Sequence, residues 1–328
     1  MKPVERQQGV ALIMVLLALA LVVMIAAGMV SRQSRAVLLA DHSLAGQQSQ
    51  QVALGVEAFA RQMLIRDVED EKNGVRTDDA SEPWLAYSAI LPVDVGQRAV
   101  AVQVNDLSGR LNLNDLVGAN GEVDRVAYER FERLFEVVGV SEVSVDALVD
   151  WIDPDNQRVS GYGAEDGAYL LQTPDYRAAN QPFTSVSELR VIDGMTEDAY
   201  QALRPNVAAL PATGAGVNVN LAPVPVLMSL HPQITRAAAE GMVEARMDAP
   251  YEQVQDFLAE PALAGTGMAN RQLQVLSRYF EVVAQVTDND NRRVALVSQL
   301  YRDDQGQVHT LNRSLGRNAR ITKPRAPM

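Results

Sequence analysis

The sequence predicts an α/β (α+β) fold in which a long N-terminal transmembrane helix packs on an antiparallel sheet, with a large all-helical domain inserted into the head. Three observations predict this fold. An unbroken apolar run opens the chain at Val10–Val30. Strand-like segments lie on both sides of a long middle region. Within that region, at 111–277, apolar residues recur with helical spacing between Gly and Pro turns.

The N-terminal apolar run is long enough to span a membrane. It holds 21 consecutive residues without a charged or hydrogen-bonding side chain, Val10–Val30. A helix rises about 1.5 Å per residue, so this run matches the ~30 Å hydrocarbon layer of a bilayer. Lys2 and Arg6 precede the run. The positive-inside bias therefore keeps the N-terminus in the cytoplasm and sends the head across the membrane, although Arg32 and Arg35 weaken this bias.

The segment before the run has the form of a short leader peptide, 1–9. An ordinary secretory signal has a shorter apolar core and a small-x-small cleavage site, which does not follow cleanly here. A cut after Gly9 would remove the basic leader and leave Val10 as an apolar new terminus. Beyond the span at 10–30, the helical pattern continues without Pro. We therefore expect one long helix from Val10 to about Arg66.

Strand-like segments flank the middle region and are expected to form the sheet of the head, at 75–110 and 278–316. Before the middle region they are Trp84–Pro92 and Arg98–Leu107. After it they are Tyr279–Thr287, Arg293–Arg302 and Gln307–Ser314, separated by polar turns. The basic tail at 317–328 is typical of a disordered end and is assigned no role.

The middle region is expected to form helices joined by short turns. The helical runs are Val126–Val138, Val145–Ile152, Ser187–Leu203, Ala222–Leu230, Thr235–Arg246 and Arg271–Leu276. Two extended segments, Arg110–Leu116 and Val217–Pro223, echo each other and carry Asn or Asp that can cap a following helix. The second is similar to the N-x-N-x-A-P entry of helix-hairpin-helix-like (SAM-like) modules, and Ile192–Thr196, between two helical runs, resembles a hairpin of that class. Four acidic and two basic residues between 187 and 205 favour helix packing over DNA contact.

The composition opposes several classes of function. The chain has 29 basic and 41 acidic residues and a net charge of −12, which disfavours binding to nucleic acid. It has no cysteine, so disulfides and thiolate metal sites are excluded. The three histidines, His42, His231 and His309, are scattered and form no zinc-binding pair on a helix.

An acidic loop in the middle region is the main candidate for a binding site. Five carboxylates fall within 17 residues between Asp150 and Asp166. Calcium prefers six to eight oxygen ligands, and crowded carboxylates repel unless a cation lies between them. Our expected metal ligands are Asp153, Asp155, Glu165 and Asp166, with Asn156 and Asp150 as further candidates, while Trp151 and Ile152 are expected to pack beneath the loop. A solvated acidic loop without metal is the alternative.

The loop does not follow the EF-hand spacing. Arg158 stands where the EF-hand has Gly, and Glu165 comes one residue late. A carboxylate pair could instead act in a glycosidase-type hydrolase, which requires a cleft between the two groups. The sequence contains no G-x-S-x-G, P-loop or H-E-x-x-H motif that would support other catalysis.

The basic leader, Gly9 and the apolar helix resemble the type IV pilin and pseudopilin class. In that class a prepilin peptidase cuts after Gly, the new terminus can be methylated, and the fifth residue after the cut is usually Glu. Here that residue is Met14. A carboxylate inside a bilayer costs roughly 2.5–3.5 kcal/mol, so Met14 indicates that no partner charge is expected there. The missing Glu and the large size resemble the K-type minor pseudopilin of type II secretion systems (the GspK family), over nearly the full length.

This resemblance implies a non-enzymatic, single-pass protein of the bacterial inner membrane, cleaved between Gly9 and Val10, with a periplasmic head. It would cap the pseudopilus tip and help initiate assembly for export of folded proteins across the outer membrane. The implied partners are the I-type and J-type minor pseudopilins, then the H-type and major pseudopilins, prepilin peptidase and inner-membrane lipid. The family carries a similar acidic arrangement associated with calcium, which supports calcium as cofactor. The competing hypothesis is a signal-anchored periplasmic hydrolase that uses the loop Asp150–Asp166.

Overall fold

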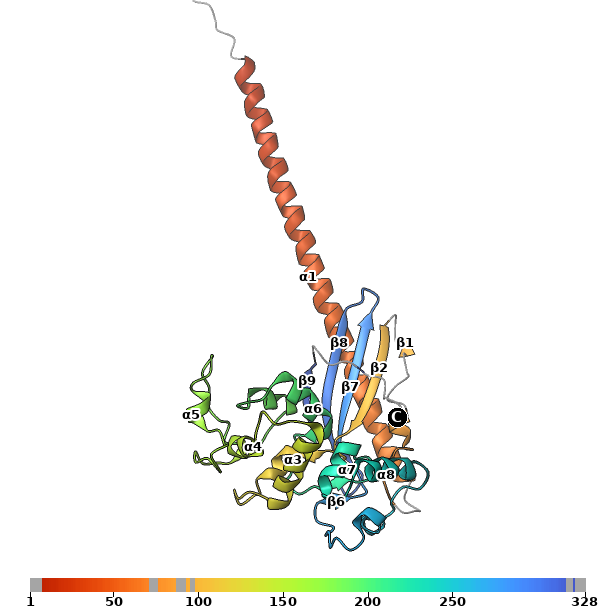
Figure 1. The fold of residues 1–328 in the computed structure, drawn as a ribbon. Helices are drawn as coiled ribbons and strands as arrows, with labels where there is room; N and C mark the ends of the chain where they lie inside the picture. The colour runs from red at the N-terminus through yellow and green to blue at the C-terminus, as the bar shows by residue number, and fades with distance from the viewer. Residues whose placement is uncertain (1–7, 71–75, 87–92, 95–97, 317–320, 322–328) are drawn as a thin grey trace, which may run out of the picture.

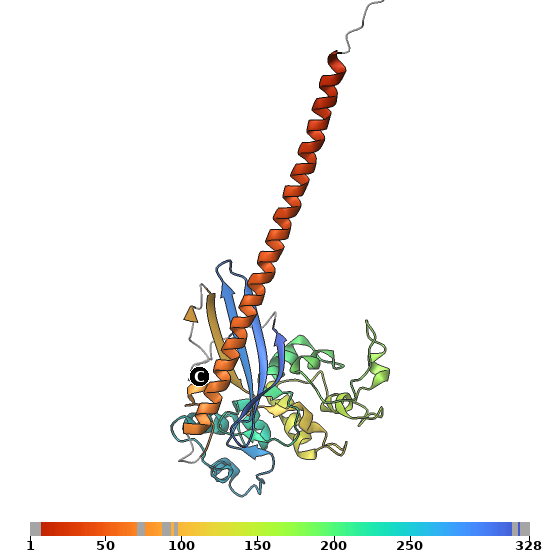
Figure 2. The same cartoon turned by 180° about the vertical axis from the view of Figure 1, so that it is seen from behind.

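A single long helix, α1 (Gln8–Asp70), dominates the N-terminal part of the computed structural model, which describes residues 8–70, 76–86, 93–94, 98–316 and 321. Residues 1–7 of the leader and most of the tail lie outside the described residues. No Pro interrupts α1, so every backbone N–H beyond its first turn can bond within the helix. The N-terminal half of α1 extends away from the head, and its C-terminal part lies on the head (Figures 1 and 2). The expectation of one long helix is confirmed.

The head contains one five-stranded antiparallel sheet of order β1-β2-β7-β8-β9. Its strands are β1 (Val93–Asp94), β2 (Arg98–Asp106), β7 (Tyr279–Asp288), β8 (Arg293–Arg302) and β9 (Val308–Leu315). Strands β2 and β7 are direct neighbours, paired from Arg98↔Asp288 to Asp106↔Phe280. The chain therefore leaves the sheet after Asp106 and returns to the adjacent position at Tyr279. Everything between is an insertion, and the expected fold class is confirmed.

The predicted strand at Trp84–Pro92 is wrong at its start. Pro83–Ala86 form a short helix, α2, with Pro at the first helical position, where its missing N–H is not needed. Trp84 is 1% exposed and packs edge-on against Phe280 at 5.2 Å, so its apolar side chain serves the head core from a helix. Residues 87–92 lie outside the described part of the chain.

Helix α1 packs on one face of the sheet through a stripe of small and apolar residues. Ala53, Ala60 and Leu64 are fully buried and recur at intervals of seven and four, which places them on one side of the helix. They contact buried side chains of the central strands, including Val102 and Phe280. Small alanines at the contact let the helix axis approach the sheet, and the C-terminal part of α1 crosses the sheet in Figure 2.

One buried carboxylate ties α1 to the edge of the sheet. Glu57 is 2% exposed and accepts hydrogen bonds from Arg313 at 2.7 and 2.9 Å, Ser298 at 2.6 Å and Thr310 at 2.9 Å. Burial acts to raise the pKa of Glu57, but these donors outweigh burial and leave the pKa lowered. Glu57 is therefore a charged anchor between α1, β8 and β9.

The inserted region is mostly helical and has its own apolar core, around side chains such as Phe131, Leu148 and Leu227. Its elements are β3 (Leu111–Asn112), η3 (Leu113–Leu116), α3 (Arg125–Val138), α4 (Val145–Ile152), α5 (Asp166–Tyr169), η4 (Val186–Val191), α6 (Glu197–Leu203), η5 (Arg204–Asn206), β4 (Val207–Ala208), β5 (Val217–Asn218), α7 (Val224–Leu230), α8 (Arg236–Asp248), α9 (Val254–Leu258), η6 (Pro261–Leu263) and β6 (Leu273–Gln274). Two short parallel pairs, β3 with β4 and β5 with β6, join distant segments.

Two local predictions for the insertion need correction. The run Arg271–Leu276 is not helical, because Gln272 has a positive φ of 55° and Leu273 pairs with Val217 as a strand. By contrast, the run Ser187–Leu203 is divided into η4 and α6 by a turn at Gly194, whose φ is 79°, as the hairpin resemblance at Ile192–Thr196 implies. Of the two echoing segments, only the first caps the following helix as expected, through Asn112. In the second, α7 begins after Pro223 without a side-chain cap.

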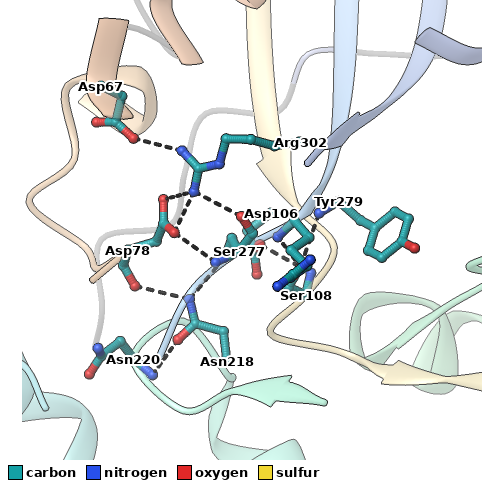
Figure 3. Close-up of polar contacts among 10 residues, drawn as sticks. Asp67, Asp78, Asp106, Ser108, Asn218, Asn220, Ser277, Tyr279 and Arg302 are labelled. Carbon is teal, nitrogen blue, oxygen red and sulfur yellow. Dashed lines mark hydrogen bonds and ion pairs between the residues drawn. The ribbon is translucent and has the colours of Figure 1, made fainter. Parts of the chain in front are cut away.

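A buried polar network joins the insertion to the head (Figure 3). Arg302 on β8 is 1% exposed and pairs with Asp67 at the end of α1, at 2.9 Å, and with Asp78. Arg302 also donates to the carbonyl of Ser277, and Asn218 of the insertion donates to the Ser277 hydroxyl at 2.8 Å. Burial opposes the charged guanidinium, but the two carboxylates outweigh it and raise the pKa of Arg302.

Candidate metal centre

The candidate centre lies where α4 ends and α5 begins. Ser144 caps the start of α4 by accepting a hydrogen bond from the Asp146 N–H at 3.1 Å. Asp150 lies on the last turn of α4, and Asp153 is its C-cap residue. Residues three apart on a helix share one face, so these two carboxylates project to the same side. Glu165 occupies the N-cap position of α5 without a side-chain cap hydrogen bond.

The structure brings Asp150, Asp153 and Glu165 together. One carboxylate oxygen from each residue lies within 4.8 Å of the others. The three residues are 0%, 7% and 4% exposed, respectively. Within the described residues, Asp150 Oδ2, Asp153 Oδ1 and both Glu165 oxygens are buried without a hydrogen-bond partner. Buried polar atoms almost always have a partner, so four unpaired acceptors in one place indicate a ligand for them.

Burial and mutual repulsion shift the protonation of all three carboxyls. Burial raises the pKa of Asp150. Burial, with the charges of Asp155 and Asp150, raises the pKa of Asp153 to about 6. Burial, with the charges of Asp150 and Asp153, raises the pKa of Glu165 to about 7. Two unit charges at this separation repel by roughly 3–4 kcal/mol at an effective dielectric constant near 20, so a cation would stabilise the cluster strongly.

The loop that carries Glu165 back to α4 is held against Asp150 by its backbone. Asp150 Oδ1 accepts a hydrogen bond from the Val159 N–H at 2.9 Å. Gly163 lies four residues further along the same loop. A Cβ added to Gly163 would lie 2.0 Å from Asp150 Oδ2. Only glycine therefore fits at 163 with the carboxylate in this position. In contrast, a Cβ at Gly161 would meet nothing within 4 Å.

Two further contacts position the loop. Asp146 accepts a hydrogen bond from the Tyr128 hydroxyl of α3 at 2.7 Å and a second from the Ser160 hydroxyl of the loop. On the other side, Trp151 is 5% exposed and packs edge-on against Tyr169 at a centroid distance of 5.1 Å. Trp151 and Ile152 are both buried beneath the loop, as the sequence predicts.

The other expected ligands lie outside this group of three. Asp155 is exposed, and its Oδ1 accepts from the Gln157 N–H at 2.7 Å. Asp166 is paired with Arg177 at 2.7 Å and accepts from the Ala178 N–H at 3.1 Å, so both its oxygens are in use. Asn156 accepts a long hydrogen bond of 3.4 Å from the Asp166 N–H.

The sequence pattern ranks Asp150 below the four main candidates, and it indicates Gly163 only as a turn-forming glycine, not as the residue that lies against Asp150. The available signal for Asp150 was its spacing of three from Asp153 at the end of a predicted helix. The donor set of three carboxylates fits a hard, oxygen-preferring cation such as calcium, which would complete its six to eight ligands with water or nearby oxygens. Soft metals prefer thiolate or thioether ligands, which this cluster does not offer.

The residues predicted from the N-terminal pattern all lie on the free part of α1. Gly9 and Val10 belong to its first turns, and Met14 is 66% exposed. In the described part of the chain, α1 is the one helix with the length and hydropathy needed to cross a membrane. Every side chain from Val10 to Leu44 is exposed, including apolar Val37, Leu38 and Leu39 beyond the span.

A long apolar helix on an antiparallel sheet defines a pilin-like fold, here with a helical domain inserted between two neighbouring strands. Two family models for type II secretion system protein K match the chain, over residues 109–212 and 217–276. The type II secretion system protein K of Pseudomonas aeruginosa is 37% identical over 94% of this chain and 93% of its own length. That of Klebsiella pneumoniae is 34% identical over 81% of this chain and 83% of its own length.

A solved structure has the same fold. It is the crystal structure of the GspK-GspI-GspJ complex from the type 2 secretion system of enterotoxigenic Escherichia coli. The matched chain is 27% identical, with a TM-score of 0.69, and the match covers 83% of this chain and 98% of that one. The present chain therefore belongs to the type II secretion system protein K family.

Proposed function

We propose that this chain is the minor pseudopilin at the tip of the type II secretion pseudopilus, where it helps initiate assembly and performs no catalysis. The observation that carries this proposal is α1, whose side chains are exposed from Val10 to Leu44. The membrane accounts for about 20 of these residues. The apolar side chains beyond the span need partner helices to cover them, which a filament of related subunits supplies.

A terminal position in the filament follows from two features of the chain. Met14 occupies the place where repeating subunits of the pilin class carry Glu, so α1 has no carboxylate for the N-terminus of a subunit added above it. The inserted domain widens the head to one side of α1 (Figure 1), which opposes regular stacking. By analogy with the GspK-GspI-GspJ complex, the proposed neighbours are the I-type and J-type minor pseudopilins. The resemblance to the pseudopilin class adds the H-type and major subunits below them to the proposal.

Processing and location follow from the same proposal. Prepilin peptidase would cut between Gly9 and Val10 and leave a methylated terminus, with α1 in the inner membrane, the N-terminus cytoplasmic and the head periplasmic. Mass spectrometry of the membrane-extracted chain should find an N-terminus at Val10. Gold labelling of the inserted domain in assembled pseudopili should mark one end of each filament. An intact Met1, or label along the shaft, would contradict the proposal.

The acidic cluster is proposed to bind calcium and stabilise the loop 153–165. A ligand at a hundred times its dissociation constant stabilises the folded state by about 2.7 kcal/mol. Calcium should therefore raise the melting temperature of the chain relative to EGTA, and Asp150→Asn should abolish that difference. Asp175→Asn is the matched control, because Asp175 is an exposed acidic residue of the same inserted domain. Equal melting with calcium and EGTA would remove the metal from the proposal.

The hydrolase alternative is less well supported. Glycosidase chemistry requires two carboxyls that reach a substrate in a cleft. The three clustered carboxylates are at most 7% exposed, which closes them to a polymeric substrate. We therefore propose a structural role for the cluster rather than a catalytic one.

A further inference from the structure

Two arginines stand on α1 just beyond the apolar run. Arg32 and Arg35 are exposed, and within the described part of the chain neither makes an ion pair or a hydrogen bond. The first ion pair between α1 and the head comes later, where Asp41 faces Arg292 at 3.7 Å. In both views the N-terminal half of α1 has no other ribbon beside it (Figures 1 and 2).

The position of the arginines along the helix corresponds to a lipid headgroup layer. The apolar run ends at Val30. At a rise of about 1.5 Å per residue, Arg32 lies about 3 Å and Arg35 about 7.5 Å beyond that end. A bilayer has ~30 Å of hydrocarbon within a total of ~40–45 Å, so each headgroup layer is about 5–8 Å thick. The backbone positions of both arginines therefore fall within this layer, and their side chains can reach lipid phosphates there.

The two side chains also share one face of the helix. Residues three apart have Cβ atoms about 5–6 Å from each other, so both guanidiniums can reach one anionic group. Arginine pairs with phosphate through two parallel hydrogen bonds. The residues between and beside them, Ser31, Gln33 and Ser34, are polar and carry no opposing charge.

We propose that Arg32 and Arg35 together bind the phosphate of an anionic phospholipid in the leaflet on the head side of the membrane. This proposal rests on the membrane anchoring proposed above. It explains why two cations stand on the side that the positive-inside bias disfavours. It also gives them a role, because a fixed phosphate contact keeps the exposed apolar segment 36–40 out of the bilayer, where partner helices can reach it.

The cysteine-free chain allows a direct test with one introduced label. Gly28→Cys is suitable because an added Cβ meets nothing within 4 Å and position 28 lies one turn below Arg32. A fluorophore at position 28 of the full-length chain is placed in vesicles that contain brominated phosphatidylglycerol or brominated phosphatidylcholine as quencher. The ratio of quenching constants gives the preference for anionic lipid around the label.

Phosphatidylglycerol should be preferred, with a binding constant on the order of 30 times that of phosphatidylcholine, because each arginine near an anionic surface contributes about fivefold. Arg32→Gln with Arg35→Gln should bring the ratio close to one. Arg66→Gln, at an exposed arginine of α1 within the head, should leave the ratio unchanged. Equal ratios in the parent chain and the double variant would overturn the proposal and favour a protein partner for the arginines.

Two further measurements distinguish a lipid headgroup from free phosphate, and a wrong lipid assignment from a lack of membrane anchoring. Inorganic phosphate is added at constant ionic strength, and a preference that survives supports a lipid headgroup as the ligand. A preference that disappears would identify free phosphate and overturn the lipid assignment. Vesicle flotation is measured first. A chain that does not float would overturn membrane anchoring as well, whereas a floating chain without lipid preference contradicts only the assignment of the arginines.

Discussion

The Asp150 carboxylate lies against the backbone of Gly163, and this contact depends on the absence of a side chain at 163. The Asp150 Oδ1 atom is held by the Val159 N–H, so the carboxylate cannot turn away without losing a hydrogen bond. Its Oδ2 atom is left unpaired beside the other two clustered acids. A methyl group at 163 would thus displace one ligand of the candidate centre.

We predict that Gly163→Ala removes the calcium-dependent rise in melting temperature, because the new Cβ would lie 2.0 Å from Asp150 Oδ2. Gly161→Ala is the matched control, two residues away, since a Cβ there meets no atom within 4 Å. Differential scanning fluorimetry with calcium and with EGTA measures both variants. If Gly163→Ala keeps the full calcium response, the described loop geometry is not the one that binds the ion.

Arg302 presents a second residue-scale case. Removing one partner of a buried ion pair costs about 3–5 kcal/mol, because the remaining charge is left buried without compensation. Arg302→Met should therefore destabilise the head by about that amount in urea unfolding, since Asp67 and Asp78 are both buried. Arg125→Met, in an exposed pair with Glu129, should change stability by no more than about 0.5 kcal/mol. Comparable losses in the two variants would contradict the weight given to the buried network.

Elements with a long, regular pattern could be predicted from the sequence, and elements decided by tertiary contacts could not. Helix α1 and strands β2, β7 and β8 follow directly from apolar periodicity. The segment Arg271–Leu276 has good helix formers, but its backbone turns at Gln272 and pairs with a strand 56 residues earlier, Val217↔Leu273. No local pattern indicates such a pairing.

In the candidate site too, part of the structure could be predicted from the local sequence and part depends on tertiary contacts. The density of carboxylates between 150 and 166 predicts the region. Which of the carboxylates converge depends on the return of the loop, which turns Glu165 inward and its neighbour Asp166 outward to Arg177. Neighbouring residues in such a loop have the same composition signal and opposite directions, so spacing alone cannot rank them.

At the same scale, the attachment of α1 to β8 and β9 depends on the charge of Glu57. Hydrogen bonds to a charged group contribute about 1.5–3 kcal/mol, so Glu57→Gln should destabilise the head by roughly that amount at neutral pH. The pKa of Glu57 is lowered in the folded state, so its stabilisation is present above the ordinary glutamate pKa and is lost as the pH falls through the lowered value. The difference between the parent chain and the variant should therefore shrink in acid.

Urea unfolding at neutral and acidic pH, followed by the fluorescence of Trp84 in a Trp151→Phe background, measures this difference. Trp84 is suitable because it is buried in the core between α1 and the sheet. Glu244→Gln, at an exposed acid of α8, should show no loss at either pH. A loss for Glu57→Gln that is independent of pH would mean that shape rather than charge explains the contact.

The whole molecule combines a thin apolar stem with a head that the insertion broadens, and these parts make opposite demands on assembly. In the tip position proposed above, the stem would pack with other helices, while the head would leave less room for a subunit above. Such a chain would join the filament once, at its end, and the uncharged residue at position 14 agrees with that proposal.

Met14→Glu tests this reading of the whole molecule. The new carboxylate would cost roughly 2.5–3.5 kcal/mol in the bilayer, and at a filament tip no N-terminus from a subunit above would offset it. We expect Met14→Glu to lower secretion of a reporter exoprotein and recovery of the chain at pseudopilus ends. Met14→Leu, which keeps an apolar side chain of similar size, should match the parent. Equal secretion by the two variants would show that the missing carboxylate has no part in placing this subunit at the tip.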